Sequence, residues 1–323
     1  RYSRPPYHVK LWELYNEPDN NHPEMAYQGG CWGQHPELYA ELLGDAQPAI
    51  RAADPESQLV LGGLAFDFFE GFDDGGVFNA DVLEEMLDSP GGTSFDIMNF
   101  HYYRAFNWRW NSFGRDVIGK VNYIRGVLEE RQLERPIMVT EIGHPSQGPA
   151  SDNQDYSDEA SSRYVVQGFT RGLAADLHSM IWFEMVDSDV EPRKYGLLTP
   201  AQTPKPAYYA YQTLTQQLGG LPFVRDDSAA SLETYIFDAG GREKYVAWST
   251  DALTQTLSVA AESVWTVDKF GARRLIVDGS LLDRDGTRNG TVRVAIGPDP
   301  RYVFAAAEGD LPARIFLPAV AGP

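Results

Sequence analysis

The segment WELYNEPDN, Trp12 to Asn20, places Glu17 directly after an asparagine and before a proline, at the end of an apolar run typical of a β-strand. A second glutamate, Glu141, ends a similar run in RPIMVTEIG, residues 135–143. A carboxylate at the end of a hydrophobic strand is seldom there for packing, because its burial is unfavourable unless it is paired. Glu17 and Glu141 are therefore the first candidates for catalytic residues, and a salt-bridged strand-end glutamate is the structural alternative for either one alone.

The composition is that of a soluble globular protein. Of the 323 residues, 43% are hydrophobic and 23% are charged, and this length could hold a modest barrel with a smaller domain. The net charge of −19 argues against nucleic acid as a partner, because phosphate binding needs a basic surface. No apolar run is long enough to cross a bilayer, so we expect no membrane partner. The single cysteine, Cys31, excludes an intrachain disulfide and a multi-cysteine metal site.

The cellular compartment is open at this stage. The chain starts at Arg1 with neither an initiator methionine nor a segment resembling a secretory leader. A secreted and a cytoplasmic location are therefore both compatible with the sequence.

Strand-like and helix-like patterns alternate over the first two-thirds of the chain, which predicts parallel βα units. The expected strands are Val9–Tyr15, Leu59–Phe66, Phe95–Tyr103, Pro136–Ile142 and Ser179–Val186. The expected helices are Pro36–Ala53, Val77–Leu87, Val117–Gln132 and Glu159–Leu177, with a last helix over Ala207–Leu218. Five strands and five following helices give an α/β domain over residues 1–219.

The pattern changes after residue 219. Short alternating runs are separated by turns rich in Gly, Asp and Asn, which is typical of a small antiparallel β-sandwich. The expected strands are Thr234–Phe237, Tyr245–Ser249, Leu275–Val277, Val292–Ala295 and Tyr302–Ala305. We therefore expect an accessory β-domain over residues 220–323.

The two glutamates fit one chemistry in particular. Cleavage of a glycosidic bond requires one carboxylic acid to protonate the leaving oxygen and one carboxylate to attack the anomeric carbon or to activate water. In barrels of parallel strands, catalytic groups lie at the C-terminal ends of the strands. Glu17 and Glu141 both occupy such positions, which predicts a two-carboxylate glycosidase.

Four short segments carry a family resemblance. WELYNEPD at 12–19, FHYY at 100–103, VTEIG at 139–143 and IWFE at 181–184 resemble clan A of the glycoside hydrolases, with families 39 and 5 the most similar. The resemblance covers about residues 1–220 and implies a retaining enzyme on a (β/α)8 barrel. It further implies that Glu17 is the general acid/base on the fourth barrel strand, that Asn16 binds the sugar 2-hydroxyl, and that Glu141 is the nucleophile on the seventh.

The same resemblance implies residues that bind the substrate. His101 and Tyr103, on the sixth strand, would line the subsite of the cleaved sugar, with the tyrosine orienting the nucleophile. Trp182, on the eighth strand, would form the floor for a sugar ring, although a packing role is the alternative for it and for His101. Trp32 and Trp108 lie in loops after strands, where aromatic side chains either stack on sugars or cap domain interfaces.

Electrostatics assign roles to the two carboxyl groups. A retaining mechanism needs them about 5–5.5 Å apart, and at that distance one charge raises the pKa of the other group. We predict that Glu17 has the raised pKa and serves as the acid. We expect no cofactor and no metal, because the sequence has no phosphate-binding loop, zinc motif or Ser–His–Asp signature.

The position of Glu17 suggests an incomplete (β/α)8 barrel of about five βα units, because a full barrel of this clan has three units before the Asn-Glu strand. A fragment, a barrel closed by a homo-oligomer and a barrel completed by a separate chain would each explain this, and we favour the homo-oligomer. The expected function is a retaining hydrolase of β-linked glucosides, xylosides or short β-glucans, with an oligo- or polysaccharide as its partner. A catalytically inactive carbohydrate-binding protein is the alternative.

Overall fold

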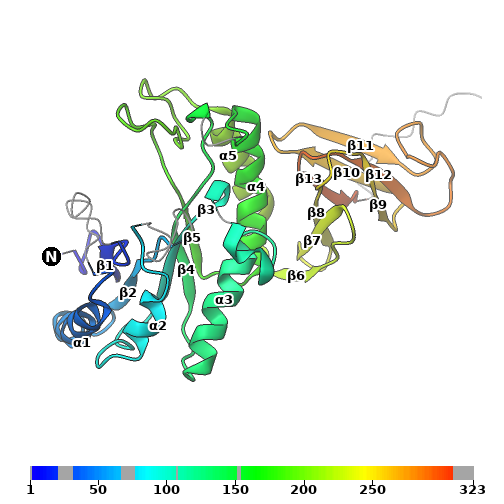
Figure 1. Ribbon diagram of the computed structural model, residues 1–323. Coiled ribbons are helices and arrows are strands. Elements are labelled where there is room, and N and C mark those ends of the chain that lie inside the picture. Colours follow the sequence, from blue (N-terminus) through cyan, green and yellow to red (C-terminus); the bar gives the residue numbers. More distant parts are fainter. Residues whose placement is uncertain (1, 21–31, 67–76, 107, 151–153, 308–323) are drawn as a thin grey trace, which may run out of the picture. The chain divides into compact units, whose positions relative to one another are not determined.

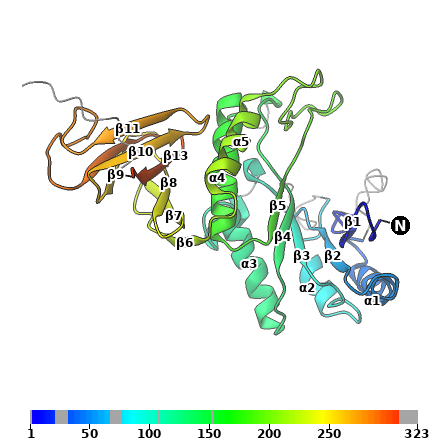
Figure 2. The same ribbon diagram turned by 180° about the vertical axis from the view of Figure 1, so that it is seen from behind.

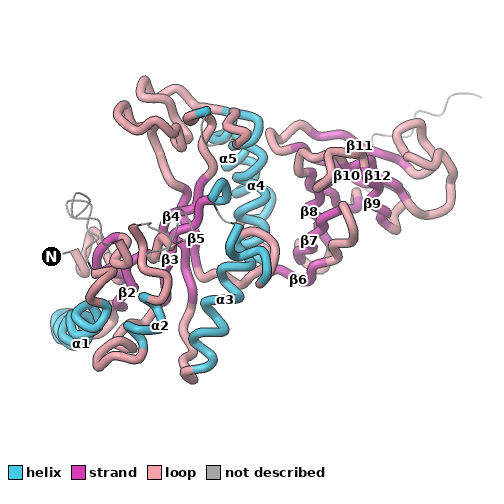
Figure 3. The backbone as a smooth tube through the Cα atoms, viewed as in Figure 1, coloured by secondary structure: helices cyan, strands magenta, loops and turns pink. Residues whose placement is uncertain are grey.

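The computed structural model describes residues 2–20, 32–66, 77–106, 108–150 and 154–307, so Cys31 lies outside the described residues. The chain forms two compact units, Arg1–Tyr208 and Tyr209–Pro323. Helices and strands alternate in the first unit, whereas strands dominate the second (Figure 3). The division falls inside helix α5 (Pro206–Leu218), and the domain boundary at residues 219 and 220 stays a prediction.

The five expected strands of the first unit are present, in chain order and parallel (Figure 1). They are β1 (Leu11–Asn16), β2 (Gln58–Gly63), β3 (Met98–Tyr103), β4 (Ile137–Gly143) and β5 (Ser179–Trp182). β1 pairs with β2, and β3, β4 and β5 form a three-stranded sheet. Two parallel bridges, Val60–Ile97 and Leu64–Phe100, connect β2 to β3. The mixed α/β architecture is confirmed, and the incomplete barrel stays our interpretation of it.

The expected helices are also present. They are α1 (Pro36–Ala53), α2 (Val82–Leu87), α3 (Val117–Glu130) and α4 (Asp158–Ala174), and two short 3₁₀ turns, η3 (Arg104–Phe106) and η4 (Trp108–Ser112), follow β3. α3 and α4 lie on one face of the sheet formed by β3, β4 and β5 (Figures 1 and 2). This leaves the other face of these strands for the candidate site. No helix within the described ranges is long and apolar enough to cross a membrane.

Helix α2 is shorter than the expected Val77–Leu87. Phe78 forms an antiparallel bridge with Asn20, and the side chain of Asn79 accepts a hydrogen bond from the backbone N–H of Asp81. Such a local side-chain turn competes with helical hydrogen bonding. The helix therefore begins only at Val82.

Strand β5 also ends early, at Trp182 rather than Val186. After Trp182 the chain pairs with a later segment: Leu197 donates to the carbonyl oxygen of Glu184 at 3.0 Å, and Leu198 donates to that of Met185 at 2.9 Å. Phe183 still donates to the carbonyl oxygen of Ile142 in β4 at 2.9 Å, and the chain then leaves β4.

The second unit consists of antiparallel strands around one core. They are β6 (Phe223–Asp226), β7 (Leu232–Asp238), β8 (Glu243–Ser249), β9 (Gln255–Val259), β10 (Ser263–Asp268), β11 (Arg273–Val277), β12 (Val292–Ile296) and β13 (Arg301–Ala305). β12 and β9 form a two-stranded sheet, and the other six form the order β11-β10-β13-β8-β7-β6. Val264 and Val303 of the larger sheet share a buried cluster with Leu257 and Val294 of the smaller one. The β-sandwich stays our interpretation of this arrangement.

Three of these strands, β6, β9 and β10, were not expected. β9 offers only Leu257 and Val259 as apolar residues, and the pairing of β6 with β7 is interrupted by a register shift. β10 is buried on both faces, so it lacks the alternation that marks a half-exposed strand.

Candidate active site

Glu17 and Glu141 lie at the C-terminal ends of two parallel strands. Glu17 follows β1 directly, and Glu141 lies in the last half of β4. The backbone of Glu17 has φ +45° and that of Tyr15 has φ +68°. Residues other than glycine seldom adopt this left-handed conformation. Such backbone strain is concentrated at functional sites, so the conformation supports a special role for the Asn16–Glu17 pair.

His101 of β3 connects the two carboxyl groups. Its Nδ1 lies 3.1 Å from Oε1 of Glu17 and 3.5 Å from Oε2 of Glu141. One oxygen of Glu17 and one of Glu141 lie within 4.8 Å of each other and of a ring nitrogen of His101. His101 is almost completely buried, while the carboxyl groups remain partly accessible. The three side chains therefore form one group, which we call the catalytic group.

The charges of the catalytic group are coupled. Burial alone would lower the pKa of His101, but the negative charges of Glu141 and Glu17 and the hydrogen bond with Glu17 raise it to about 9. Burial raises the pKa of Glu141, and His101 and Tyr103 offset part of this rise. The imidazole therefore carries a proton at neutral pH. The prediction of a raised pKa for Glu17 stays a prediction.

Tyr103 holds Glu141 from the other side. Its buried hydroxyl donates a hydrogen bond to Oε2 of Glu141. The ring of Tyr103 contacts Tyr195 and Phe183, with centroids 5.2 and 5.9 Å away. These two aromatic residues were not expected near the site. They reach it because the chain after β5 turns back along residues 184–198, a pairing that local sequence patterns do not reveal.

A second hydrogen-bond chain lies behind His101. Nε2 of His101 is 3.2 Å from Oγ1 of Thr140, and Oγ1 of Thr140 is 3.1 Å from Oε1 of Glu13. Nδ2 of Asn99 donates to the same oxygen of Glu13 at 2.8 Å. A protonated His101 donates from both nitrogens, so the order of donors runs from His101 to Thr140 to Glu13. Glu13 of β1 was not among the expected site residues, and its even spacing of four from Glu17 was the signal that could have indicated a shared face.

Gly63, the last residue of β2, makes room for His101. A Cβ at this position would lie 2.2 Å from Nε2 of His101. The imidazole thus packs directly on the backbone of β2, which fixes the ring against its two carboxylate partners.

The remaining expected residues lie in different places. Asn16 ends β1 beside Glu17, and Trp32 packs its ring on Tyr15 with a centroid distance of 5.6 Å. Trp108 is 72% exposed in η4. The structure thus keeps Asn16 and Trp32 near the end of β1, whereas Trp108 belongs to the loop after β3.

The structure does not bring Trp182 to the catalytic group. Its ring packs against Tyr164 and Phe169 of α4, and its Nε1 donates to the carbonyl oxygen of Tyr195. It pairs across the sheet with Ile142, which follows Glu141 and therefore faces the opposite side of β4. With 7% exposure on the helix side of the sheet, Trp182 has the contacts of a core residue rather than of a sugar-stacking floor.

The geometry of the catalytic group could also hold a metal ion, because its three ligand atoms lie close together. A metal binds an imidazole nitrogen only in its unprotonated form. The pKa of about 9 keeps His101 protonated at neutral pH, so a metal would have to displace that proton. The expected absence of a metal stays a prediction.

Comparisons with known proteins find relatives by structure. No protein-family model and no curated protein matches the sequence. A family 39 glycoside hydrolase from Bacteroides cellulosilyticus WH2 superposes with a TM-score of 0.65 at 23% identity, over 92% of this chain and 58% of that one. A family 51 α-L-arabinofuranosidase from Thermotoga petrophila RKU-1 has a TM-score of 0.62 at 13% identity, over 94% of this chain and 67% of that one. A family 30 endoxylanase from Clostridium papyrosolvens C71 has a TM-score of 0.57 at 13% identity, over 92% of this chain and 66% of that one.

These structures are clan A glycoside hydrolases, so the resemblance to the clan, and to family 39 within it, is confirmed at the level of the fold. The likeness to family 5 stays a prediction. The chain spans 58% of the length of the family 39 structure.

Proposed function

We propose that this protein is a retaining glycoside hydrolase that cleaves β-linked glucosides, xylosides or short β-glucans with Glu17 and Glu141. The observation that carries the proposal is the approach of the two carboxyl oxygens to within 4.8 Å, with His101 between them. This approach is close to the separation of about 5–5.5 Å in retaining enzymes and well short of the about 6.5–9.5 Å by which inverting enzymes separate the two groups to admit a water molecule. The similarity to a family 30 endoxylanase supports a xylan-type substrate among the candidates.

In the first step, Glu141 attacks the anomeric carbon while Glu17 gives its proton to the leaving oxygen. The bond to the leaving group breaks and an ester between Glu141 and the sugar forms. Tyr103 engages Oε2 of Glu141, so we infer that Oε1 is the attacking atom. In the second step, water gives a proton to Glu17 and displaces Glu141, which restores the anomeric configuration.

Two of the side chains support this cycle without reacting. The charge of the His101 imidazolium is balanced by the Glu141 carboxylate while Glu17 carries its proton, and by both carboxylates once Glu17 has given the proton up. Its hydrogen bond to Glu17 fixes the position of the acid. Tyr103 fixes Glu141 in the same way.

The test is hydrolysis of p-nitrophenyl β-glycosides by the intact chain and by Glu17→Gln and Glu141→Gln variants. We expect either change to lower kcat by about 10³-fold or more, in line with the loss of a general acid or a nucleophile. Glu130→Gln, at an exposed site in α3, has the same chemical change and should leave kcat unaltered.

The stereochemistry and the alternative function are tested separately. Proton NMR of the first product should show the β-anomer, and an initial α-anomer would overturn the retaining mechanism. Binding of xylo-oligosaccharides without any turnover would instead support the catalytically inactive carbohydrate-binding protein.

A further inference from the structure

Asp19 belongs to the same short segment as Glu17, WELYNEPDN, but takes no part in the proposed reaction. It is completely buried. The N–H of Asn20 donates to the carbonyl oxygen of Glu17 at 3.0 Å, which closes a tight turn that begins at Glu17. Pro18 favours this turn, because its φ is fixed at the value that the second residue of a turn requires. Asp19 therefore lies in the backbone turn that follows the proposed acid.

The side chain of Asp19 connects this turn to the residues that follow β2. Its Oδ1 accepts a hydrogen bond from the backbone N–H of Ala65 at 3.2 Å, and its Oδ2 accepts one from that of Phe66 at 2.9 Å. Its backbone carbonyl oxygen accepts a third bond, from the N–H of Asn79, at 3.0 Å. Hydrogen bonds to a charged acceptor are stronger than those between neutral groups. The ionised side chain of Asp19 thus fixes the turn after β1 to the loop after β2.

Lys120 of α3 brings a positive charge to the same place. Its side chain is buried, and its Nζ donates to the carbonyl oxygens of Leu64 at 3.3 Å and His101 at 3.0 Å. Leu64 directly precedes the two residues that bind Asp19, and His101 belongs to the catalytic group. The charge of Lys120 also acts on Asp19. Two buried groups of opposite charge therefore lie beside the ends of β1, β2 and β3.

The charge of Asp19 is coupled to that of Glu17. Burial, and next the negative charge of Glu17, raise the pKa of Asp19 to about 7. The hydrogen bond from Ala65 and the charge of Lys120 offset part of this rise. Tyr39 of α1 is another described side chain on which the charge of Asp19 acts. Repulsion between two carboxylates acts equally on both, so a charge on one of them favours a proton on the other.

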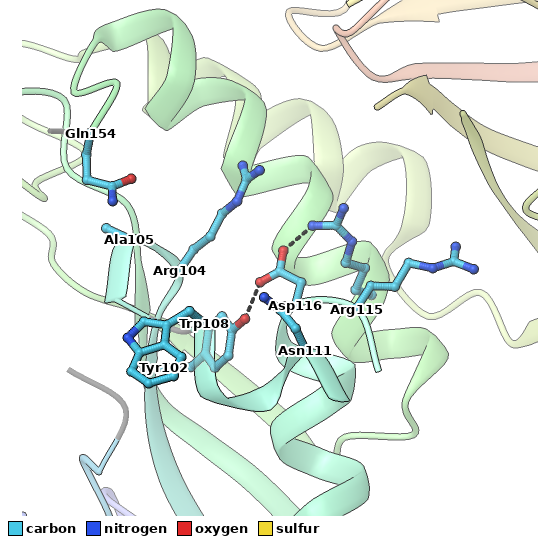
Figure 4. A pocket seen from close by; sticks show the side chains of 9 residues that line it. Tyr102, Arg104, Ala105, Trp108, Asn111, Arg115, Asp116 and Gln154 are labelled. Atoms are coloured by element: carbon cyan, nitrogen blue, oxygen red, sulfur yellow. Dashed lines mark hydrogen bonds and ion pairs between the residues drawn. The ribbon is translucent and has the colours of Figure 1, made fainter. Parts of the chain in front are cut away.

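Asp116, a buried carboxylate that accepts a hydrogen bond from Tyr102, shows the opposite case (Figure 4). Burial raises the pKa of Asp116, but the positive charges of Arg171 and Arg104 outweigh burial and lower it. Asp116 therefore keeps its charge at neutral pH and forms a buried ion pair with Arg171. Asp19 instead has a second carboxylate two residues away, and carboxyl pairs of this kind divide the acid and base roles between them.

We propose that Asp19 is a positioning residue for Glu17: its buried carboxylate fixes the turn that carries the acid, and its charge favours the proton on Glu17 until the leaving oxygen takes it. The same charge makes Glu17 a stronger base towards water in the second step. The proposal rests on the proposed glycosidase function, because that function makes Glu17 the acid.

The test compares two leaving groups. Cleavage of a phenyl β-glycoside depends on proton transfer from the acid, whereas dinitrophenolate leaves a 2,4-dinitrophenyl β-glycoside with little need of a proton. Asp19→Asn removes the charge and replaces one acceptor oxygen by an NH2 group, which cannot accept a backbone N–H. We expect kcat/KM for the phenyl glycoside to fall by about tenfold or more, and that for the dinitrophenyl glycoside to change little.

Asp278→Asn is the matched control. Asp278, in the second unit, is also buried and accepts hydrogen bonds from the backbone N–H groups of Asn289 and Gly290. This variant should keep the ratio of the two kcat/KM values of the parent chain. An unaltered ratio in Asp19→Asn, even with both values lowered, would show a structural role alone and overturn the proposal.

A second measurement leaves Asp19 in place and so does not depend on the folding of Asp19→Asn. Carbon-13 NMR of the carboxyl groups follows the titration of Asp19 in the parent chain, in Glu17→Gln and in the control Glu130→Gln. Loss of the charge of Glu17 should lower the pKa of Asp19 from about 7, whereas Glu130→Gln should leave it unaltered. An Asp19 pKa that does not respond to Glu17→Gln would overturn the proposal. Absent turnover in the parent chain would instead overturn the glycosidase function, and this titration would still decide whether the two carboxyl groups are coupled.

Discussion

At the residue scale, His101 determines the charge of the catalytic group. Three carboxylates, those of Glu13, Glu17 and Glu141, lie around one imidazole, directly or through Thr140. Their combined effect outweighs that of burial and raises the pKa of the His101 ring to about 9. The protonated ring donates hydrogen bonds from both nitrogens, so it connects Glu17 through Thr140 to Glu13.

Replacement of Thr140 by valine should weaken this network. Valine has nearly the same shape but no oxygen to accept from Nε2 of His101, so the charged imidazole is less stabilised and its pKa falls. We expect the pKa of His101 to decrease by about one unit. This corresponds to roughly 1.4 kcal/mol, the magnitude of one hydrogen bond to a charged group. NMR titration of His101 measures the pKa directly, and the alkaline limb of kcat against pH should move to lower pH. Thr140→Ser keeps the hydroxyl and should retain the original profile; an unchanged pKa in Thr140→Val would refute the role of Thr140.

The raised pKa of His101 also predicts a pH dependence of stability. A group whose pKa is higher in the folded state stabilises the fold fully below its unfolded pKa, about 6.5, and this contribution is lost as pH rises to about 9. The free energy of unfolding should therefore fall over this window, by on the order of 3 kcal/mol at most. Urea unfolding of the parent chain and of His101→Gln at several pH values measures the difference. The variant should show a flatter dependence between pH 6.5 and 9, and equal slopes for both proteins would contradict the prediction.

At the element scale, part of the site could be predicted from strand alternation. Asn99, His101 and Tyr103 are two residues apart on β3, and the structure places all three on the face of the catalytic group. Trp182 was expected on that face, but its pairing with Ile142 places it on the helix side. The face to which each side chain of a short strand points depends on the register of that strand with its neighbour. This register cannot be read from the sequence of the strand alone.

Strand β4 shows why Thr140 could not be predicted. Phe100 pairs with Val139 but His101 pairs with Glu141, so the register shifts and Thr140 is an extra residue in β4. Such a bulge lets two consecutive side chains, Thr140 and Glu141, both reach the catalytic group. Alternation alone would have put Thr140 on the other face.

The close contact between β2 and β3 gives a prediction at this scale. In Gly63→Ala, the new Cβ would lie 2.2 Å from Nε2 of His101, so the imidazole or strand β2 must move. We expect kcat to fall at least tenfold and the protein to lose roughly 1–3 kcal/mol of stability through overpacking. Gly126→Ala in helix α3 is the matched control, because nothing lies within 4 Å of its Cβ position and alanine favours the helix. Full activity of Gly63→Ala would show that the ring position does not matter for turnover.

At the scale of the whole molecule, the first unit exposes apolar side chains on its outermost strands. Among the described strands, β1 pairs with β2 alone and β5 pairs with β4 alone. Val9, Leu11 and Tyr15 are exposed at β1, and Ile181 and Met185 are 52% and 62% exposed at and after β5. Unpaired strand edges with apolar side chains are sites at which a second chain can add.

We therefore expect the 36.0 kDa chain to self-associate, with the outermost strands β1 and β5 at the contact. Size-exclusion chromatography with light scattering should give a mass of at least twice that of one chain at micromolar concentration. Ile181→Lys with Met185→Lys adds two charges to the exposed apolar surface, so it should shift the protein towards the monomer. Val190→Lys, at a side chain that is 88% exposed away from any strand, adds a charge without touching these edges and should leave the mass unaltered. A monodisperse, folded monomer of the parent chain would contradict the expectation, and turnover by that monomer would show that the catalytic group works without a second copy.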